Sequence, residues 1–346
     1  MYKLKDEYQG RVCPWMVSNG QKAEFRVKLL WELDRSLFDK VGSEDIKEIM
    51  KWYKVGLFEY APAVFRKTCA GQHIAQSDLA SSFDPQLNLS TMRKHAGNKG
   101  GRSDAFIYFT HDKKFIIKTL NHREMETLRR TLRDMTEYYS SREGQYSLLA
   151  KFFGVFTLYF QGRSAIHIAI MENIIPPTMT VTAVFDLKGS RVHRQTLLSP
   201  SIRSLAQVSS KQVLKDLDFR QVLGTVPLPA NYHRYLHAQL HNDTEELRRL
   251  NLMDYSLLVA VCKVGLGEVH DSRFVHREIK GKDEQFMCYV GVIDYLQKYT
   301  VKKKLETSKN AALSPRTPPA FHSCVHPLLY SRRFCTFLQD LFPNSS

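Results

Sequence analysis

Gly291-Val-Ile-Asp-Tyr-Leu-Gln-Lys-Tyr-Thr-Val-Lys-Lys-Lys-Leu-Glu306 is the stretch around which the chain is organised. An apolar, strand-like run delivers a single acid, Asp294. The chain then becomes basic before it reaches another acid, at Lys302, Lys303, Lys304 and Glu306. A carboxylate next to an exposed basic segment suits an enzyme that holds a metal-bound phosphate and sits on an anionic surface. Taken alone, the stretch is more often a strand end followed by a solvated charge run, so the rest of the sequence has to decide.

The composition describes an ordinary globular protein with an unusual charge. The 346 residues are enough for one large or two small domains. Lys and Arg number 50 against 35 Asp and Glu, and the formal charge of +15 attracts polyanions such as nucleic acid, acidic lipid headgroups or nucleotide phosphates. The six cysteines form no C-x-x-C pair, so we expect reduced thiols in the cytoplasm. No window approaches the about 20 uncharged residues of a membrane span, so we expect any membrane association to be peripheral.

Strands and a helix are predicted upstream of this stretch. Residues 105–109 and 114–119 read as two strands, and Lys118 lies near the end of the second, with its ammonium expected to reach a cleft. Apolar residues at helical spacing between Met125 and Met135 predict a helix of about 18 residues. Residues 165–171 alternate strictly and predict a further strand.

Three acids lie at the ends of apolar strands. The strand at residues 181–185 leads to Asp186 and Lys188, which point the same way if the strand continues. Asp254 comes just ahead of an apolar run, and Asp294 ends the last one. Phosphoryl transfer needs such parts, because it depends on positioning and charge neutralisation. One acid orients the attacking hydroxyl, another holds magnesium, and a lysine and a glycine-rich turn hold the phosphates.

The strings themselves carry a resemblance. Phe185-Asp-Leu-Lys-Gly-Ser-Arg-Val-His-Arg194, Met253-Asp-Tyr-Ser-Leu-Leu258 and Ile293-Asp294 closely resemble signatures of the phosphatidylinositol phosphate kinases. The resemblance runs from about residue 50 to the end and also includes Tyr60-Ala-Pro-x-x-Phe-Arg66, Phe115-Ile-Ile-Lys-Thr119, Lys215-Asp-Leu-Asp-Phe219 and Tyr330-Ser-Arg-Arg-Phe334. It implies a two-lobed, protein-kinase-related α+β fold with antiparallel sheets and flanking helices. It also implies an N-terminal extension (1–50), an N-terminal lobe (51–173) and a C-terminal lobe (174–346) with an activation loop at about 297–328.

For the nucleotide, the resemblance implies that Lys118 contacts the ATP phosphates. The glycine-rich turn would supply Gly100, Gly101 and Ser103, and the backbone from Met171 to Asn173 would meet adenine. A helix glutamate would pair with Lys118. The family pattern favours Glu126, whereas the helical face favours Glu124; we prefer Glu126, because Glu124 can be occupied in the helix cap.

For the chemistry, the resemblance places Asp186, Lys188 and Arg194 in a D-L-K-G-S-x-x-x-R motif, with Lys188 reaching phosphate. Asp254 would orient the lipid hydroxyl, and Asp294 would be the principal Mg²⁺ ligand. The resemblance implies that enzymes acting on phosphatidylinositol 4-phosphate carry Glu at the position of Glu306, whereas those acting on the 5-phosphate carry Ala. The resemblance therefore points to a type I enzyme that makes phosphatidylinositol 4,5-bisphosphate from ATP and this lipid, peripherally bound to the cytosolic face of a membrane such as the plasma membrane.

Some alternatives remain open at this stage. Asp104 stands where relatives have a glycine, and an acid beside ATP phosphates would repel them, so a weakly active phosphoinositide-binding scaffold competes with an active kinase. A kinase that adds the 4-phosphate to phosphatidylinositol 5-phosphate is the other alternative. Nucleic acid is not expected as a partner, since the interleaving of aromatic and basic residues is lacking. The sequence leaves the oligomeric state undecided, with a homodimer among the states allowed.

Overall fold

A computed structural model of the chain describes residues 46–52, 55–95, 105–160, 164–191, 194–197, 202–208, 212–263, 272–281, 286–300 and 325–345. The chain forms two compact units. The described residues up to Asn121, together with Lys151–Asn173, belong to unit 1, and His122–Ala150 and the residues from Ile174 onward belong to unit 2. The lobe and loop boundaries expected from the sequence stay predictions. None of the helices in the described ranges is long and apolar enough to span a bilayer.

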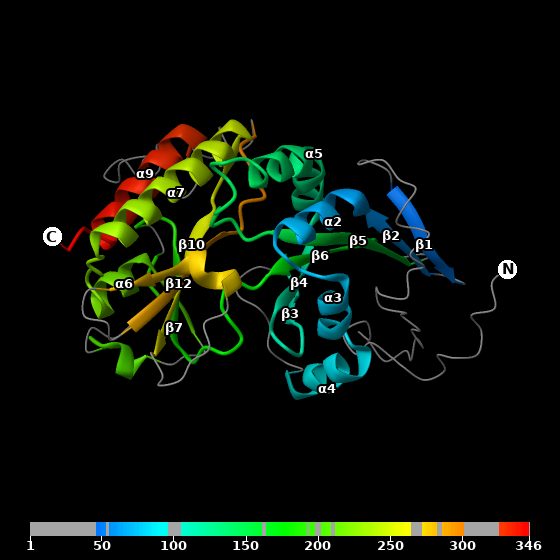
Figure 1. Cartoon of the computed structure of the whole chain (residues 1–346), viewed down its shortest axis with the longest axis horizontal. Helices are drawn as coiled ribbons and strands as arrows, with labels where there is room; N and C mark the ends of the chain where they lie inside the picture. Colours follow the sequence, from blue (N-terminus) through cyan, green and yellow to red (C-terminus); the bar gives the residue numbers. More distant parts are fainter. Residues whose placement is uncertain are drawn as a thin grey trace. The chain divides into compact units, whose positions relative to one another are not determined.

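Unit 1 contains a six-stranded antiparallel sheet in the order β1-β2-β5-β6-β4-β3 (Figure 1). Its strands are β1 (Ile46–Trp52), β2 (Val55–Tyr60), β3 (Ile107–Phe109), β4 (Phe115–Leu120), β5 (Phe152–Phe160) and β6 (Ile166–Glu172). Its helices are α2 (Pro62–Gly71), α3 (Gln76–Ser82) and α4 (Pro85–His95). The ring of Phe115 packs between Phe83 and Phe153, with centroid distances of 5.9 and 5.6 Å. The core of this unit therefore joins the sheet to its helices.

Unit 2 contains a five-stranded sheet in the order β11-β12-β10-β7-β8, and only β8 runs parallel to its neighbour among the described strands. Its strands are β7 (Val181–Leu187), β8 (Val213–Lys215), β10 (Ser256–Lys263), β11 (Glu278–Lys280) and β12 (Phe286–Ile293). A two-stranded ladder joins β9 (Leu252–Met253) to β13 (Gln297–Lys298). The helices are α5 (His122–Tyr139), α6 (Asp216–Val222), α7 (Ala230–Arg249) and α9 (Pro327–Leu341), with 3₁₀ turns at Leu205–Gln207 and Ser272–Arg277.

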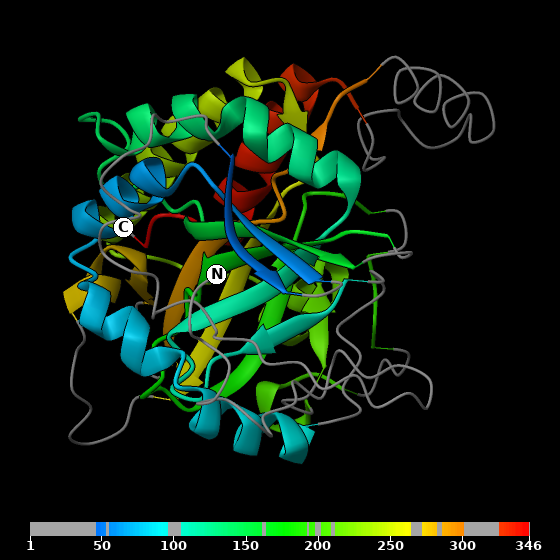
Figure 2. The same cartoon turned by 90° about the vertical axis from the view of Figure 1, so that its right-hand side faces the viewer.

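The core of unit 2 explains its apolar runs. β10 is the central strand, and its residues from Leu257 to Cys262 are buried on both faces except Leu258, so the run is continuous rather than alternating. Phe219 of α6 joins the sheet to the end of α9, because its ring lies 5.0 Å from Phe185 and 5.6 Å from Phe342. Figure 2 shows α9 lying along α7, as in Figure 1. The α+β class with antiparallel sheets and flanking helices is thus confirmed.

A buried acid on α7 ties the long helix α5 into unit 2. Asp243 is fully buried; it accepts hydrogen bonds from the Tyr138 hydroxyl at 2.7 Å and from the Leu148 amide at 2.8 Å. Burial raises the pKa of Asp243, while these hydrogen bonds oppose the rise. The segment after α5 then pairs with β12 through Leu149 and Val292. The predicted helix of about 18 residues is confirmed as His122–Tyr139.

Candidate active site

The three strand-end acids lie at one end of the five-stranded sheet. Asp186 is the partner of Leu258 in the antiparallel ladder of β7 and β10. In the antiparallel ladder of β10 and β12, Ser256 at the start of β10 is paired with Ile293 at the end of β12. Asp254, just before β10, and Asp294, just after β12, therefore lie at the same end of the sheet. The register of three neighbouring strands therefore gathers residues from positions 186, 254 and 294 of the sequence.

Asp254 and Asp294 occupy the same kind of backbone turn. Both have positive φ, 65° and 58°, a left-handed conformation that costs a non-glycine residue about 1–2 kcal/mol. Each acid is followed by a tyrosine, Tyr255 or Tyr295, that is at most 1% exposed. Beyond the turns the chain pairs again in the ladder of β9 and β13. Strain of this kind persists only where the surroundings hold it, and it concentrates at functional sites.

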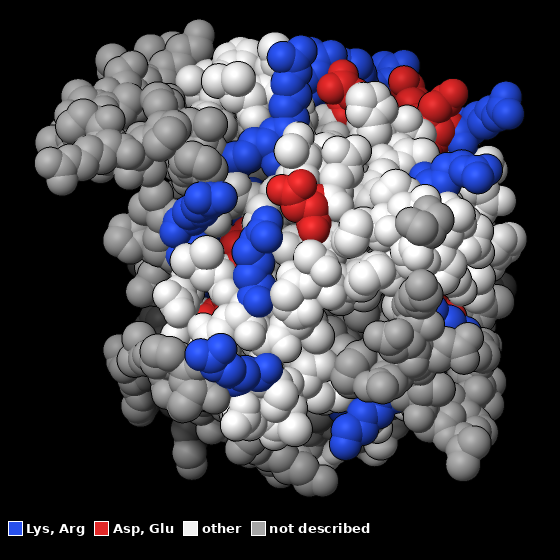
Figure 3. Space-filling model, turned by 90° about the vertical axis from the view of Figure 1, so that its left-hand side faces the viewer, with Lys and Arg blue, Asp and Glu red and all other residues white. Residues whose placement is uncertain are grey.

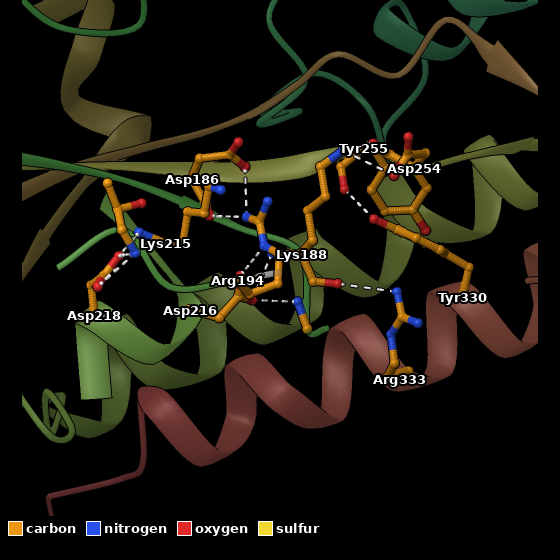
Figure 4. Close-up of polar contacts among 12 residues, drawn as sticks. Asp186, Lys188, Arg194, Lys215, Asp216, Asp218, Asp254, Tyr255, Tyr330 and Arg333 are labelled. Carbon is orange, nitrogen blue, oxygen red and sulfur yellow. Dashed lines mark hydrogen bonds and ion pairs between the residues drawn. The ribbon is translucent and has the colours of Figure 1, made fainter. Parts of the chain in front are cut away.

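Lys188 and Asp254 form the central ion pair (Figure 4). The Lys188 Nζ lies 2.9 Å from the Asp254 Oδ1 and also donates to the Asp254 carbonyl oxygen at 2.7 Å. The side chains are 17% and 32% exposed, so the pair is partly shielded from water but open to a small ligand. A cation beside the carboxylate holds it in one orientation and places positive charge where an anion would approach.

Asp186 and Lys188 do not make a joint site, because β7 ends at Leu187. The Arg194 Nη2 lies 3.3 Å from the Asp186 Oδ1 and donates to the Asp186 carbonyl oxygen. The Arg194 Nε donates to Asp216 Oδ2 at 2.5 Å. Burial works against the charge of Arg194, but Asp216 and Asp186 outweigh it and raise its pKa. In this conformation Asp186 therefore belongs to a buried network, whereas Lys188 turns to Asp254 (Figure 4).

Asp216 is a site residue that the sequence reasoning missed. Its Oδ1 accepts the amide hydrogens of Lys188 at 2.9 Å and Gly189 at 2.7 Å, and its carboxylate is 1% exposed. Asp218, two residues along in α6, accepts from the amides of Thr196, Leu197 and Lys215. Both acids begin a helix, where carboxylates are favoured. The string Lys215-Asp-Leu-Asp-Phe219 was the available signal, but the sequence alone gave these acids no partner.

The last helix, α9, also reaches the motif and was missed as part of the site. The Tyr330 hydroxyl donates to the carbonyl oxygen of Tyr255, and the Arg333 Nη2 donates to that of Lys188 at 3.3 Å. Figure 4 shows both side chains pointing from α9 toward the motif. A Cβ on Gly189, which has φ +67°, would lie 3.2 Å from the Phe337 Cβ. Glycine is thus required there both by the turn and by the approach of α9.

Asp294 differs from Asp254 by being exposed to solvent. Its neighbour Tyr295 donates through its hydroxyl to the Ala150 carbonyl oxygen at 2.5 Å, which anchors the turn. No group of three or more His, Cys, Asp or Glu side chains gathers for a metal within the part of the chain that the structure describes. Mg²⁺ commonly binds one or two protein carboxylates and fills its shell with water and substrate phosphates. An accessible carboxylate such as that of Asp294 fits this pattern.

The predicted nucleotide residues lie partly in unit 1. Lys118 lies within β4, between Ile107 of β3 and Ala169 of β6. Met171 is in β6, and Asn173 follows it with its side-chain amide donating to the Lys113 carbonyl oxygen at 2.7 Å.

The remaining predicted residues lie in unit 2 or outside the described ranges. Glu126 lies on α5 in unit 2 and pairs with Arg130 at 2.5 Å on an exposed face. Several predicted residues lie outside the described ranges: Gly100, Gly101, Ser103, Asp104, Lys302, Lys303, Lys304 and Glu306.

Comparison with known proteins gives a consistent set of relatives. The family model "Phosphatidylinositol-4-phosphate 5-Kinase" matches residues 90–278 and 266–341. The chain is 26% identical to phosphatidylinositol 4-phosphate 5-kinase 1 of Arabidopsis thaliana, over 82% of this chain and 44% of that protein. It is 27% identical to phosphatidylinositol 4-phosphate 5-kinase type-1 alpha of Rattus norvegicus, over 81% of this chain and 56% of that protein. The chain thus spans about half the length of these two relatives.

A fungal relative shares more identity over a shorter region. The chain is 30% identical to phosphatidylinositol 4-phosphate 5-kinase its3 of Schizosaccharomyces pombe, over 66% of this chain and 29% of that protein. The matched region of the family model includes all the motif residues of unit 2 described above.

Proposed function

Because the chain belongs to the phosphatidylinositol-4-phosphate 5-kinase family, we propose that it is a lipid kinase that phosphorylates phosphatidylinositol 4-phosphate. It transfers the γ-phosphate of ATP to the 5-hydroxyl of the inositol ring and makes phosphatidylinositol 4,5-bisphosphate. The observation that carries the proposal is the Lys188–Asp254 ion pair at the same end of the sheet as the accessible Asp294. Two carboxylates and one ammonium at one end of a sheet are the groups that phosphoryl transfer needs.

Asp254 is proposed to orient the attacking hydroxyl. Its carboxylate accepts a hydrogen bond from the inositol hydroxyl, and it takes up the proton as the new oxygen–phosphorus bond forms and the bond to ADP breaks. Lys188 lies 2.9 Å from the same carboxylate, so any phosphate that approaches the hydroxyl also approaches its ammonium. Lys188 therefore both holds Asp254 and neutralises charge on the transferred group.

Asp186 and Arg194 are proposed to support the site rather than to touch the substrate. The Arg194 side chain is 10% exposed, and its guanidinium lies between the carboxylates of Asp186 and Asp216. Asp216 in turn holds the amides of Lys188 and Gly189. This network fixes the backbone from which the Lys188 ammonium extends, and a truncated Arg194 would leave the buried carboxylate of Asp216 without its cation.

Asp294 is proposed as the protein ligand for Mg²⁺. An exposed carboxylate is a hard oxygen donor of the kind this ion prefers. When bound, Mg²⁺ neutralises charge on the phosphate oxygens of ATP.

The nucleotide is proposed to be bound by Lys118, Gly100, Gly101, Ser103, Glu126 and the backbone from Met171 to Asn173. In this conformation the amides of Glu172 and Asn173 already donate to the carbonyl oxygens of Lys151 and Lys114.

Membrane contact is proposed for the basic segment Lys302, Lys303 and Lys304, with Glu306 selecting the 4-phosphate substrate. Each lysine near an anionic surface adds about 1 kcal/mol of attraction. On the face shown in Figure 3, Lys and Arg side chains prevail over Asp and Glu side chains among the described residues. The bilayer contact, on the cytosolic face of the plasma membrane, is assigned to the segment after Asp294 because of its three consecutive lysines.

The test is to identify products from a panel of mono-phosphorylated phosphatidylinositols. Purified protein with ATP and Mg²⁺ is expected to make phosphatidylinositol 4,5-bisphosphate from phosphatidylinositol 4-phosphate in anionic vesicles, and Lys118→Met should abolish this. The same product made only from phosphatidylinositol 5-phosphate would favour the 4-kinase alternative. Nucleotide binding without product on any lipid would favour the scaffold alternative. Light scattering of the purified protein would decide whether it is a homodimer.

A further inference from the structure

Helix α9 contacts both loops that carry the central ion pair. The Tyr330 hydroxyl donates to the carbonyl oxygen of Tyr255, the residue after Asp254. The Arg333 guanidinium donates to the carbonyl oxygen of Lys188 itself. Residues three apart lie on the same face of a helix, so one face of α9 holds a backbone oxygen from each loop.

These contacts form one packed unit. Tyr330 is fully buried, and its ring lies 4.6 Å from that of Tyr255 in an edge-on arrangement. The Arg333 guanidinium lies over the Tyr330 ring, 4.7 Å from its centroid. Phe334 adds a second edge-on contact to Tyr255 at 5.1 Å. A cation stacked on an aromatic ring inside a packed cluster has few alternative positions, so the two donors keep a fixed spacing.

The strained backbone at Asp254 has to be stabilised by its surroundings. A left-handed residue other than glycine is strained and persists only when its surroundings fix it. The Tyr330 bond fixes the peptide that follows Tyr255, one residue beyond Asp254, and the Arg333 bond fixes the peptide that follows Lys188. On the other side, Asp216 holds the Lys188 amide at 2.9 Å. Lys188 is thus held at both its N–H and its C=O.

We propose that Tyr330 and Arg333 are positioning residues for phosphoryl transfer, which set the separation of the Lys188 ammonium and the Asp254 carboxylate. Neither touches the reacting atoms. They act through two backbone carbonyl oxygens, and the helix that carries them serves as a spacer between the two loops. The catalytic part of this inference rests on the proposed lipid kinase activity, whereas the positioning of the loops can be measured without it.

Tyr330→Phe is the sharpest test, because it keeps the ring packing and removes only the hydroxyl. We expect kcat to fall about tenfold, with the KM for ATP within about twofold, since a small displacement of a positioned group is expensive for the chemical step. Tyr235→Phe is the matched control: its hydroxyl also donates to a backbone carbonyl, that of His276 at 2.8 Å, but far along the chain from both loops. The control should lower thermal stability to a similar degree and leave kcat unchanged.

Arg333→Met and Arg333→Lys test the second contact. The methionine variant removes the donor and should lower kcat by about tenfold, and the lysine variant, which retains a donor, should recover part of that loss. Arg220→Met is its control, because Arg220 also stacks on an α9 ring, Phe337, at 5.4 Å without bonding to either loop. If the two contacts set one distance, the Tyr330→Phe/Arg333→Met double variant should be little worse than the more damaged single variant.

Hydrogen exchange separates this proposal from the proposed function. In protein without substrate, Tyr330→Phe should speed amide exchange in the peptides covering 186–190 and 253–257 by about fivefold, and Tyr235→Phe should not. If the wild-type protein phosphorylates no lipid but exchange changes in this way, the proposed activity fails and the positioning role stands. If kcat and exchange in both peptides match the controls, Tyr330 and Arg333 are ordinary core residues and the inference is overturned.

Discussion

The turns at Asp254 and Asp294 are alike in backbone and different in surroundings. Each is an Asp-Tyr pair at the end of a strand, with the acid at positive φ and the tyrosine buried. Asp254 is held by Lys188, and the carbonyl of its tyrosine is held by α9. Asp294 remains exposed, and its tyrosine is anchored instead to Ala150. The same backbone turn thus presents two carboxylates, of which one is partly buried against a cation and the other is exposed to solvent.

The largest effect is expected from Asp294→Asn, which removes the carboxylate assigned to Mg²⁺. Lipid phosphorylation should fall on the order of 10³-fold, because metal stabilisation of transferring phosphates is worth several kcal/mol. Radiolabelled ATP and vesicles with phosphatidylinositol 4-phosphate would measure it across a Mg²⁺ titration. The residual activity should need more Mg²⁺ than the wild type. An unchanged Mg²⁺ requirement would contradict the assignment of Mg²⁺ to Asp294.

Asp254→Asn should cost about 10²-fold in kcat, at the lower end of what a positioned acid or base contributes. The amide keeps the size of the side chain but no longer accepts a proton or pairs with the Lys188 ammonium. The Mg²⁺ requirement of this variant should equal that of the wild type, measured in the same titration. Equal kcat in variant and wild type would contradict the role given to Asp254.

Gly189→Ala tests the loop that carries Lys188, the partner of Asp254. We expect about 2–3 kcal/mol of lost stability, from the left-handed φ and from the close approach of Phe337 and α9. Gly224→Ala is the matched control, since Gly224 has nearly the same φ, +66°, with no atom within 4 Å of an added Cβ. It should lose only about 1 kcal/mol. Urea denaturation would measure both, and equal losses would show that α9 does not press on Gly189.

The smallest effect concerns stability at the two acids themselves. Asp294→Gly should change the stability by at most about 0.5 kcal/mol, because the side chain is exposed and relief of left-handed strain offsets the entropy cost of glycine. Asp254→Gly should destabilise the protein by about 1 kcal/mol, because the partly buried Lys188 loses its partner. Thermal melts of both variants measure the two changes. Equal losses would mean that the surroundings do not distinguish the turns.

Much of the fold followed from local patterns. The spacing of Met125 and Leu128 predicted α5 because one stripe of that helix is buried, and both side chains are at most 3% exposed. The strand predicted at 181–185 extends to Leu187, and the end of β7 there overturns the condition under which Asp186 and Lys188 would point the same way. The need for glycine at position 189 cannot be read from strand periodicity, since it comes from the positive φ of the turn and from the approach of α9.

The site residues were predictable from the sequence only where an acid or a lysine stands at the end of an apolar strand within a recognisable string. Asp186, Lys188, Asp254 and Asp294 stand at strand ends within recognisable strings, and their roles stay predictions until activity is measured. Asp216 and Arg333 also lie in recognisable strings, but they stand at no strand end, and a buried acid at a helix start and an arginine on an amphipathic helix are common. Their importance comes from partners 27 and 145 positions away. Such pairings depend on packing, which a linear pattern does not specify.

By itself the sequence determined the family, the fold class and the identity of the charged groups, because these depend on residue types and on spacings within single elements. The tertiary structure alone decided which of these groups meet. Sheet register brings Asp186, Asp254 and Asp294 to one end of a sheet, and the docking of α6 and α9 holds Lys188 against Asp254. Contacts between distant segments are set by the packing of whole faces, so the two Asp-Tyr turns, nearly the same in sequence, acquire different surroundings.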